Sequence, residues 1–285
     1  MPQTQKERAF SRKVDELIKK AQNMENAEVK KTIQTLNNAR KEVAAIMAST
    51  DWQAYHLPQL KAAIERAMQE FGDRYGVDLR NAQGEFWNHG VEIVDTPLRE
   101  VGIYAAIPAI DTTVLSIMQN FSTDLVKGLT KDAVQKIQQE ITMGMLGQKT
   151  PFEVMGGIGR NLKDKSIFRS IAARAETITR TECGRVLEAA GQARREEAAK
   201  VVPGLQKKWL HGESSKVPRI THIAANGQIR DVETPFDVGG EQLMYPRDPA
   251  GSPGNTINCG CYTVPYHADW NAAAGTDEER QAAAG

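Results

Sequence analysis

Residues 166–200 read SIFRSIAARAETITRTECGRVLEAAGQARREEAAK and contain no proline. Successive residues of an α-helix are separated by about 100°, so residues three and four apart share a face. On this spacing, the residues that form one apolar stripe are Phe168, Ile171, Ala175, Ile178, Val186, Ala189 and Ala193. The stretch therefore predicts one long helix with a buried face.

Glu182 falls at the centre of this apolar stripe. Burial of a carboxylate without a partner costs several kcal/mol or forces the group to take up a proton. We therefore expect Glu182 to meet a cation or several hydrogen-bond donors. Because Arg180 lies on the opposite side of the helix, Arg219 and His222 are the predicted partners.

The chain before this helix is also predicted to be helical. Residues 6–48 contain no proline or glycine and carry apolar residues at spacings of three and four, which predicts one long amphipathic helix. A second helix is expected over 57–75, with Gly72 and Gly76 marking its end. Residues 76–102 have weak periodicity and are predicted to be mixed loop and short helix.

The next segment carries helix start and stop signals. Residues 113–127 are amphipathic, and Thr130 is predicted to cap a further helix that runs through Met145 and ends at Gly147. Thr150, followed by Pro151 and Glu153, has the sequence of a capping box and predicts another helix start.

Beyond Pro203 the pattern changes to short runs typical of strands, separated by Gly, Pro, Asn and Asp. These runs are 206–210, 219–224, 228–232, 242–244 and 261–264. Asn226-Gly227 predicts a type I′ hairpin turn. The expected fold class is α+β, with a mostly helical N-terminal region followed by a small C-terminal domain that contains a short antiparallel sheet.

Four regions are expected along the chain. They are a helical region that docks on a partner (1–110), a helical lead-in (111–165), a small α+β domain (166–266) and an acidic, alanine-rich tail (267–285).

Composition excludes several classes of protein. The 285 residues carry 36 Lys+Arg and 36 Asp+Glu, a net charge of +0, which argues against a general DNA coat. No apolar run reaches the length of a membrane span, so no membrane contact is expected. Three cysteines are too few for a disulfide scaffold, and the N-terminus lacks a secretory signal pattern.

Charge is nevertheless uneven along the chain. Residues 6–48 hold ten basic and six acidic residues, and 160–180 hold six basic and two acidic residues. Such runs usually form a solvated face, but they also suit contact with packaged DNA. The candidate DNA-contacting residues are Arg160, Lys163, Lys165, Arg169 and Arg174.

Cys259-Gly260-Cys261 would place two thiols on the same face of a strand, where a disulfide between them would be strained. With His222 and His267 the thiols make a possible set of four zinc ligands, because thiolate and imidazole suit that metal. The alternative is two small, half-buried side chains in a tight turn. The sequence predicts no cofactor, and zinc at this set stays open.

Two catalytic interpretations also stay open. Cys259, His222 and Asn258 have the residue types of a nucleophile, a base and an orienting amide, although no glycine-rich turn leads into a helix N-terminus that would lower the thiol pKa. His211 and His222 have the residue types of an acid/base pair for RNA cleavage. An enzyme of this kind would be a nuclease or hydrolase, and we expect none.

An ordered series of short motifs runs through the second half of the chain. It comprises Ala175-Glu176-Thr177-Ile178-Thr179-Arg180-Thr181-Glu182, Gly191, Lys208-Trp209, Arg219-Ile220-Thr221-His222, Asn226-Gly227, Phe236, Pro246-Arg247-Asp248-Pro249 and Asn258-Cys259-Gly260-Cys261. In order and spacing this series resembles the phage minor head, or head morphogenesis, proteins typified by the Mu F protein. The resemblance covers residues 114–264. The chain departs from the family pattern at Glu213-Ser214-Ser215, where an aspartate is usual, and at Gly260, where arginine is common.

The resemblance implies a low-copy structural protein of a tailed-phage head that acts in head morphogenesis. The implied partners are the portal protein, the major capsid protein and packaged double-stranded DNA, with several copies around the portal. The implied location is the head interior or portal vertex, reached from the host cytoplasm during assembly. A DNA-binding protein ejected with the genome is the main alternative.

The family resemblance also implies a structural motif rather than a catalytic centre. Its residues are Arg180, Thr181, Glu182, Trp209, Arg219, His222, Asn258, Cys259 and Cys261. Some relatives carry a toxin or nuclease module after the Cys-x-Cys segment. Only about twenty residues follow it here, too few for another domain, so we expect no built-in effector enzyme.

Overall fold

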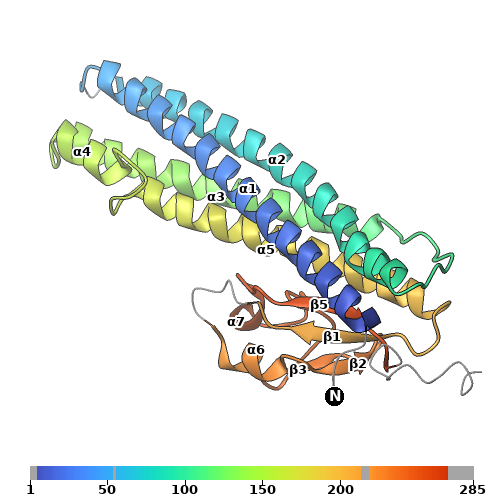
Figure 1. Ribbon diagram of the computed structural model, residues 1–285. Helices are drawn as coiled ribbons and strands as arrows, with labels where there is room; N and C mark the ends of the chain where they lie inside the picture. Colours follow the sequence, from blue (N-terminus) through green and yellow to red (C-terminus); the bar gives the residue numbers. More distant parts are fainter. Residues whose placement is uncertain (1–4, 54–55, 213–217, 269–285) are drawn as a thin grey trace, which may run out of the picture. The chain divides into compact units, whose positions relative to one another are not determined.

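The computed structural model describes residues 5–53, 56–212 and 218–268. The helices are α1 (Gln5–Ser49), α2 (Leu57–Glu100), α3 (Thr113–Met145), α4 (Pro151–Ile158), α5 (Ile167–Ala199), α6 (Ile220–Ala225) and α7 (Pro253–Thr256). The strands are β1 (Gln206–Leu210), β2 (Ile229–Asp231), β3 (Phe236–Val238), β4 (Glu241–Leu243) and β5 (Tyr262–Tyr266). Long helices precede a small antiparallel sheet (Figure 1), which confirms the predicted α+β class.

The chain forms two compact units. We call Glu25–Gly84 with Leu115–Cys183 the bundle unit, and Met1–Met24, Glu85–Val114 and Gly184–Gly285 the sheet unit. Helices α1, α2, α3 and α5 contribute residues to both units. Within the described residues, no helix combines the length and the apolar character that crossing a membrane requires.

The bundle unit packs long helices around an aliphatic core and a small polar cluster. Tyr75 Oη donates a hydrogen bond to the carbonyl of Ala175 at 2.9 Å and lies 2.9 Å from Thr179 Oγ1. Thr32 Oγ1 lies 3.3 Å from the same threonine hydroxyl. These contacts join α1, α2 and α5. The aliphatic core that surrounds them includes Leu36, Val43, Ile64, Met68, Ile137 and Ile141.

The carboxylate of Glu182 is buried in this unit, with an exposed fraction of 3%. Ser122 Oγ donates to Glu182 Oε2 at 3.4 Å. Arg219 instead donates to the carbonyl of Ile257, and both ring nitrogens of His222 face other groups. The burial predicted from the stripe is confirmed, whereas the described contacts differ from the predicted pairing with Arg219 or His222.

The prediction that a helix over 57–75 gives way to mixed loop and short helix up to 102 is wrong, because α2 is one continuous helix. It continues through the glycines that were expected to end it, and no mixed loop follows Gly76. At Gly72 a Cβ atom would lie 2.5 Å from Thr130 Oγ1, and at Gly90 one would lie 2.3 Å from the carbonyl oxygen of Leu187. These glycines therefore permit close helix packing, a role that local sequence does not distinguish from helix termination.

A second predicted helix boundary, at Thr130, is wrong because α3 is continuous there. Thr130 was predicted to cap a new helix, but it lies inside α3, where its hydroxyl donates to the carbonyl of Val126 at 2.9 Å. The predicted capping box at α4 is confirmed. Thr150 Oγ1 accepts from the backbone N–H of Glu153, and the Glu153 carboxylate accepts from the backbone N–H of Thr150.

The sheet unit contains a three-stranded sheet in the order β2-β1-β5 and a separate β3-β4 pair, all antiparallel. Strand β1 is central, and Lys208 pairs with both Ile229 and Val264. The prediction for 206–210 is confirmed with the same bounds as β1. The predictions for 228–232, 242–244 and 261–264 are confirmed as strands with shifted ends, and β3 was missed.

Residues 219–224 were predicted to be a strand, which is wrong because helix α6 occupies this segment. Apolar runs this short do not separate strand from helix by periodicity. The predicted type I′ turn is also wrong. Asn226 has φ −57° and caps α6, whereas a type I′ turn needs positive φ at both central residues. Gly227 alone of the two has a positive φ, +83°.

Candidate metal centre

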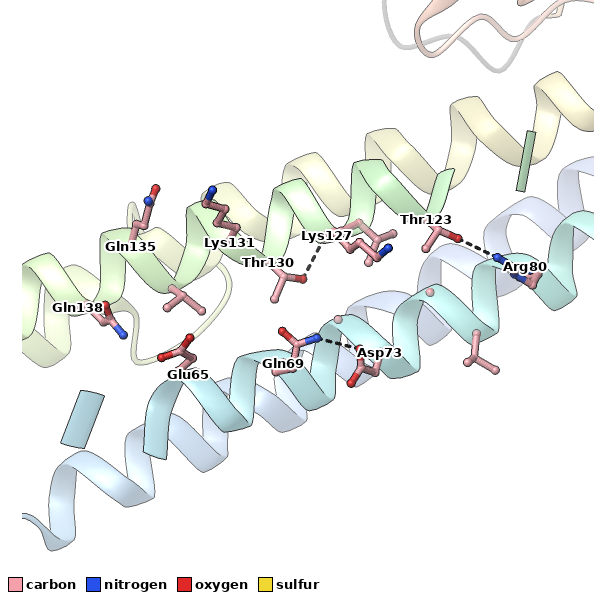
Figure 2. A pocket seen from close by; sticks show the side chains of 15 residues that line it. Glu65, Gln69, Asp73, Arg80, Thr123, Lys127, Thr130, Lys131, Gln135 and Gln138 are labelled. Atoms are coloured by element: carbon pink, nitrogen blue, oxygen red, sulfur yellow. Dashed lines mark hydrogen bonds between the residues drawn. The ribbon is translucent and has the colours of Figure 1, made fainter. Parts of the chain in front are cut away.

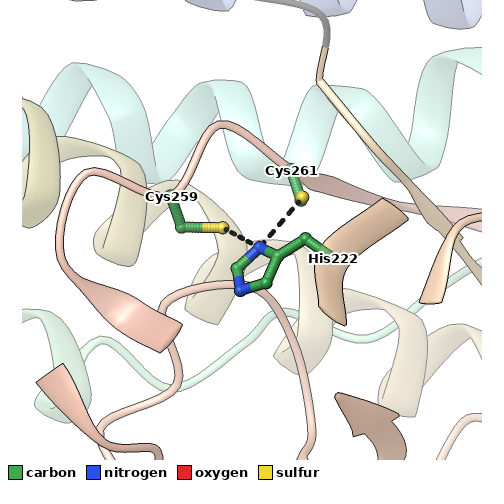
Figure 3. A group of neighbouring side chains, drawn as sticks. All are labelled: His222, Cys259 and Cys261. Atoms are coloured by element: carbon green, nitrogen blue, oxygen red, sulfur yellow. Dashed lines mark hydrogen bonds between the residues drawn. The ribbon is translucent and has the colours of Figure 1, made fainter. Parts of the chain in front are cut away.

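Three potential metal ligands converge in the sheet unit. His222 comes from α6, and Cys259 and Cys261 come from the segment between α7 and β5 (Figure 3). Their ligand atoms all lie within 4.8 Å of one another. The exposed fractions of the three residues are only 2%, 1% and 2%, respectively.

The two sulfur atoms are equally distant from one ring nitrogen. Cys259 Sγ and Cys261 Sγ each lie 3.4 Å from His222 Nδ1. A hydrogen bond places its acceptor along the N–H direction, so one N–H cannot point well at two sulfur atoms. The Nδ1 atom therefore faces the space between the two thiols.

Asn255 contacts the other ring nitrogen of His222, Nε2. Its Nδ2 donates to the carbonyl of Val238 at 3.2 Å, which orients Oδ1 toward His222 Nε2 at 3.3 Å. Because that amide oxygen can only accept, Nε2 is the nitrogen that donates to it, and Nδ1 is the nitrogen left to face the thiols. In the tautomer with the proton on Nε2, Nδ1 presents a lone pair to the two sulfur atoms.

The two thiols influence each other's protonation. The neighbouring Cys261 thiol lowers the pKa of Cys259 well below its usual value, and the same interaction raises the pKa of Cys261. The pair therefore holds one thiolate more readily than two. A low thiol pKa at Cys259 was not predicted from the sequence, because its cause is a contact made across the folded loop.

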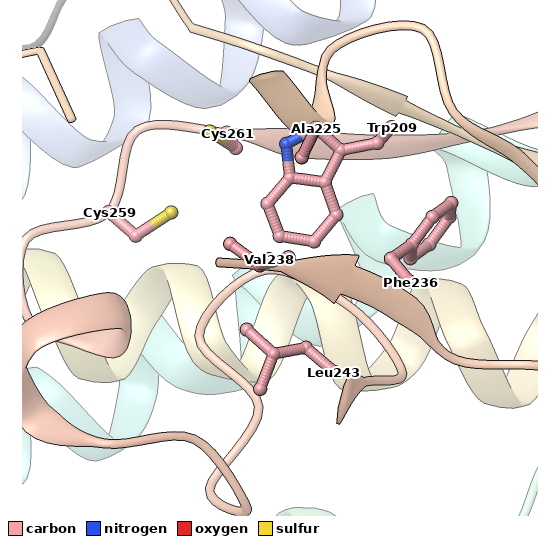
Figure 4. Packing of buried hydrophobic residues seen from close by; sticks show 7 residues of the cluster. All are labelled: Trp209, Ala225, Phe236, Val238, Leu243, Cys259 and Cys261. Carbon is pink, nitrogen blue, oxygen red and sulfur yellow. The ribbon is translucent and has the colours of Figure 1, made fainter. Parts of the chain in front are cut away.

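An aromatic core supports the cluster from the sheet side (Figure 4). The Trp209 ring packs edge-on against the His222 ring, with centroids 6.0 Å apart, and against Phe236, with centroids 5.3 Å apart. Trp209 Nε1 is buried and has no well-formed hydrogen bond among the described residues. The remaining members of this core are Ala225, Val238, Leu243 and the two cysteines.

Sequence reasoning missed a group of buried charged residues beside this core. Burial raises the pKa of Glu188 to about 7 and lowers the pKa of Lys207 to about 7. Arg195 donates to the carbonyl of Thr263 at 2.8 Å, and Thr263 donates its backbone N–H to Glu188 at 3.1 Å. The alternation along β1 is the signal that could have found Lys207, because it shares a face with Trp209.

His267 does not belong to the centre, which corrects the proposed set of four ligands. Its Nε2 lies 2.9 Å from the carbonyl oxygen of Pro203. Asn258 has φ +53° and lies between α7 and the two cysteines, which shapes the turn that brings both thiols inward. His211 is placed by its backbone N–H, which donates to Asn226 Oδ1 at 2.9 Å.

The remaining motif residues lie on α5 and at the start of α6. Arg180 forms ion pairs with Glu25 at 2.5 Å and with Glu176 at 3.1 Å. Thr181 is buried, with an exposed fraction of 3%. Arg219 Nη2 donates to the carbonyl of Ile257 at 2.6 Å.

The candidate DNA-contacting residues lie in the bundle unit. Lys163, Lys165 and Arg169 are exposed. Arg160 packs over the Phe152 ring, 3.6 Å from its centroid. Arg174 pairs with Asp132 at 2.5 Å, so part of its charge is neutralised.

A groove of about 790 Å³ separates α2 from α3 in the bundle unit (Figure 2). Glu65 and Asp73 line it from α2, and Lys127 and Lys131 line it from α3. The motif residues do not line this groove. The acidic tail predicted over 267–285 lies outside the described residues, apart from 267 and 268.

Comparisons with known proteins give two partial matches. No protein-family model matches the chain, and no solved structure gives a significant match. The chain is 36% identical over 107 residues to the uncharacterized protein YqbB of Bacillus subtilis, which covers 36% of this chain and 33% of that protein. It is 29% identical over 133 residues to the NAD(+)–arginine ADP-ribosyltransferase EFV of Enterococcus faecalis, which covers 47% of this chain and 26% of that protein. The matches span about a third and about a quarter of these relatives.

Proposed function

We propose that this chain is a minor structural protein of a tailed-phage head, associated with the portal or procapsid and acting in head morphogenesis. The proposal rests on the ordered motif series between Ala175 and Cys261. The structural observation that supports it most is the deep burial of six of the nine motif residues. Trp209, His222, Cys259 and Cys261 are each at most 2% exposed, and they pack around one core with Phe236.

Burial of this kind favours a structural role for the motif. A catalytic group has to reach its substrate, and active sites are usually concave and lined by the reacting side chains. The described 790 Å³ groove is lined by other residues, on α2 and α3. The buried motif residues of the sheet unit therefore serve to hold that unit together.

The partial match to an ADP-ribosyltransferase fits the same proposal. The matched segment makes up only 26% of that enzyme, which leaves ample length for a separate catalytic part. The family resemblance includes relatives with an effector module attached to the head-protein segment. We infer that the shared segment is the structural part, and we expect no ADP-ribosyltransferase activity from it.

The decisive experiment follows the chain through particle assembly. Heads are purified from a producing strain and from a strain that lacks the gene, and the protein content of the particles is measured by mass spectrometry. We expect the chain in assembled heads at low copy number, and fewer or aberrant heads in the deletion strain. Normal infectious heads without the chain would contradict the proposal.

A DNA-binding protein ejected with the genome is the second candidate, and the exposed Lys163, Lys165 and Arg169 favour it. Contacts to phosphate release counterions, so DNA affinity would fall steeply between low and moderate salt. Docking on a capsid or portal surface through apolar contacts would change little. A salt titration of the purified chain against double-stranded DNA and against assembled heads separates the two candidates.

A further inference from the structure

We propose that the sheet unit contains a zinc site in which His222 Nδ1, Cys259 Sγ and Cys261 Sγ bind one Zn²⁺ ion. Three protein ligands leave the fourth position of a tetrahedron to a water molecule. The proposal stands on the described contacts of these residues and is independent of the proposed role in phage heads.

The distances between the ligand atoms suit zinc. With Zn–S of about 2.3 Å and Zn–N of about 2.05 Å, tetrahedral angles place sulfur and nitrogen about 3.6 Å apart. The two Sγ–Nδ1 distances in the structure are both 3.4 Å. A metal ion therefore fits between the three atoms with only small movements of the side chains.

The tautomer of His222 supports metal binding over a simple hydrogen-bonded cluster. Asn255 Oδ1 accepts the Nε2 proton, so Nδ1 presents its lone pair to the thiols. That lone pair can accept one S–H hydrogen at a time, which would draw one sulfur closer than the other. A single cation can bond to Nδ1 and to both sulfur atoms at once, and metal-ligating histidines usually donate their other ring N–H to an oxygen acceptor of the protein, as His222 does here.

The ligand charges and the neighbouring Trp209 N–H both suit a buried zinc ion. Two thiolates neutralise the two positive charges of Zn²⁺, so the filled site has no net charge to bury. The buried Trp209 Nε1–H, which has no well-formed hydrogen bond among the described residues, faces the side of the cluster that holds Cys261 (Figure 4). A metal-bound thiolate would be a stronger acceptor for this N–H than a neutral thiol.

The first test uses the full-length wild-type chain, purified without chelators from zinc-supplemented cells. We expect one equivalent of zinc by elemental mass spectrometry. After exchange with Co²⁺, we expect the visible bands of tetrahedral Co²⁺ and a thiolate-to-metal charge-transfer band. A wild-type chain that carries no zinc and binds no Co²⁺ overturns the proposal.

Matched variants locate the site. Cys259→Ser and Cys261→Ser should lower zinc affinity at least about tenfold, whereas Cys183→Ser removes a buried cysteine of α5 and should retain the metal. His222→Gln should lose zinc and His267→Gln should keep it. Zinc retained in the Cys259→Ser, Cys261→Ser double variant would refute the assignment, as would equal losses in the Cys183→Ser control.

A measurement on the wild-type chain covers the case in which ligand variants fail to fold. A thiol reagent is added to native protein before and after zinc removal, and the modified cysteines are identified by mass spectrometry. We expect Cys259 and Cys261 to react faster by about tenfold or more once zinc is removed, and Cys183 to change little. Equal reactivity of Cys259 and Cys261 with and without zinc would overturn the proposal.

Discussion

The bundle unit and the sheet unit bury polar groups in different ways. In the bundle unit, hydroxyl and carboxyl groups meet in short chains, such as Gln83 to Ser122 at 2.8 Å and Ser122 to Glu182 at 3.4 Å. In the sheet unit, charged side chains and thiols are themselves part of the interior, and Arg195 and Lys207 are fully buried. A long amphipathic helix can bury an aliphatic stripe, whereas short strands offer too little apolar surface to form a core of that kind.

The difference also shows in how each unit depends on distant residues. The bundle unit is built from stripes whose period is set within each helix. The centre at His222, Cys259 and Cys261 needs residues almost forty positions apart to meet, as the contact from α6 to the segment before β5 shows. The sheet unit should therefore be the more sensitive of the two to changes at single contact points.

The largest expected effect comes from Gly90, at the contact between α2 and α5 in the sheet unit. A Cβ atom there would lie 2.3 Å from the Leu187 carbonyl oxygen, and a helix backbone cannot move aside cheaply. We expect Gly90→Ala to lower the free energy of unfolding by about 3 kcal/mol. Denaturant unfolding followed by circular dichroism measures this change.

Gly84, in the bundle-unit part of the same helix, is the matched control. A Cβ atom at Gly84 would meet nothing within 4 Å. Gly84→Ala should therefore raise the free energy of unfolding by about 0.5 to 1 kcal/mol through helix propensity. Equal effects of the two substitutions would contradict the close approach of α2 and α5 at Gly90.

Glu182→Ala tests the polar chain of the bundle unit and should lower the free energy of unfolding by about 1 to 3 kcal/mol. The physical reason is the loss of a buried carboxylate that accepts a hydrogen bond from Ser122 Oγ. Glu182→Gln keeps the shape and one oxygen, so it should cost less. A melting temperature equal to that of wild type in Glu182→Ala would contradict a partnered role for this carboxylate.

The smallest effect is expected at the capping box of α4. The backbone N–H of Thr150 lowers the pKa of Glu153, so the folded state favours the carboxylate more than the unfolded chain does. The resulting stability is present above the unfolded pKa of about 4.5 and is lost as the pH falls through the lower folded value. Glu153→Gln should therefore lower the melting temperature slightly at about pH 7 and have little effect at about pH 3.

A thermal series between these two pH values checks that prediction. Glu176→Gln serves as a control because Glu176 is a partly exposed acid of the same unit that pairs with Arg180 rather than with a helix end. A loss at Glu153→Gln that does not depend on pH would show that the carboxylate contributes little to the cap.

The sequence by itself determined the features that depend on local spacing. The stripe over 166–200 was enough to predict α5 and the burial of Glu182, because helical period and side-chain polarity suffice to show which face is covered. The capping box at Thr150 could also be predicted from the sequence, since both of its hydrogen bonds join residues three apart. The sequence also identified His222, Cys259 and Cys261 as candidate metal ligands, but it grouped His267 with them.

Only the tertiary structure decided features that depend on contacts between distant segments. Gly72 and Gly90 lie inside α2 because neighbouring helices approach there, and a glycine looks the same in sequence whether it ends a helix or admits a neighbour. His267 faces the carbonyl of Pro203, while α6 directs His222 to the two thiols. Residue types and spacing define what a set of side chains can bind, and the path of the chain decides which of them meet.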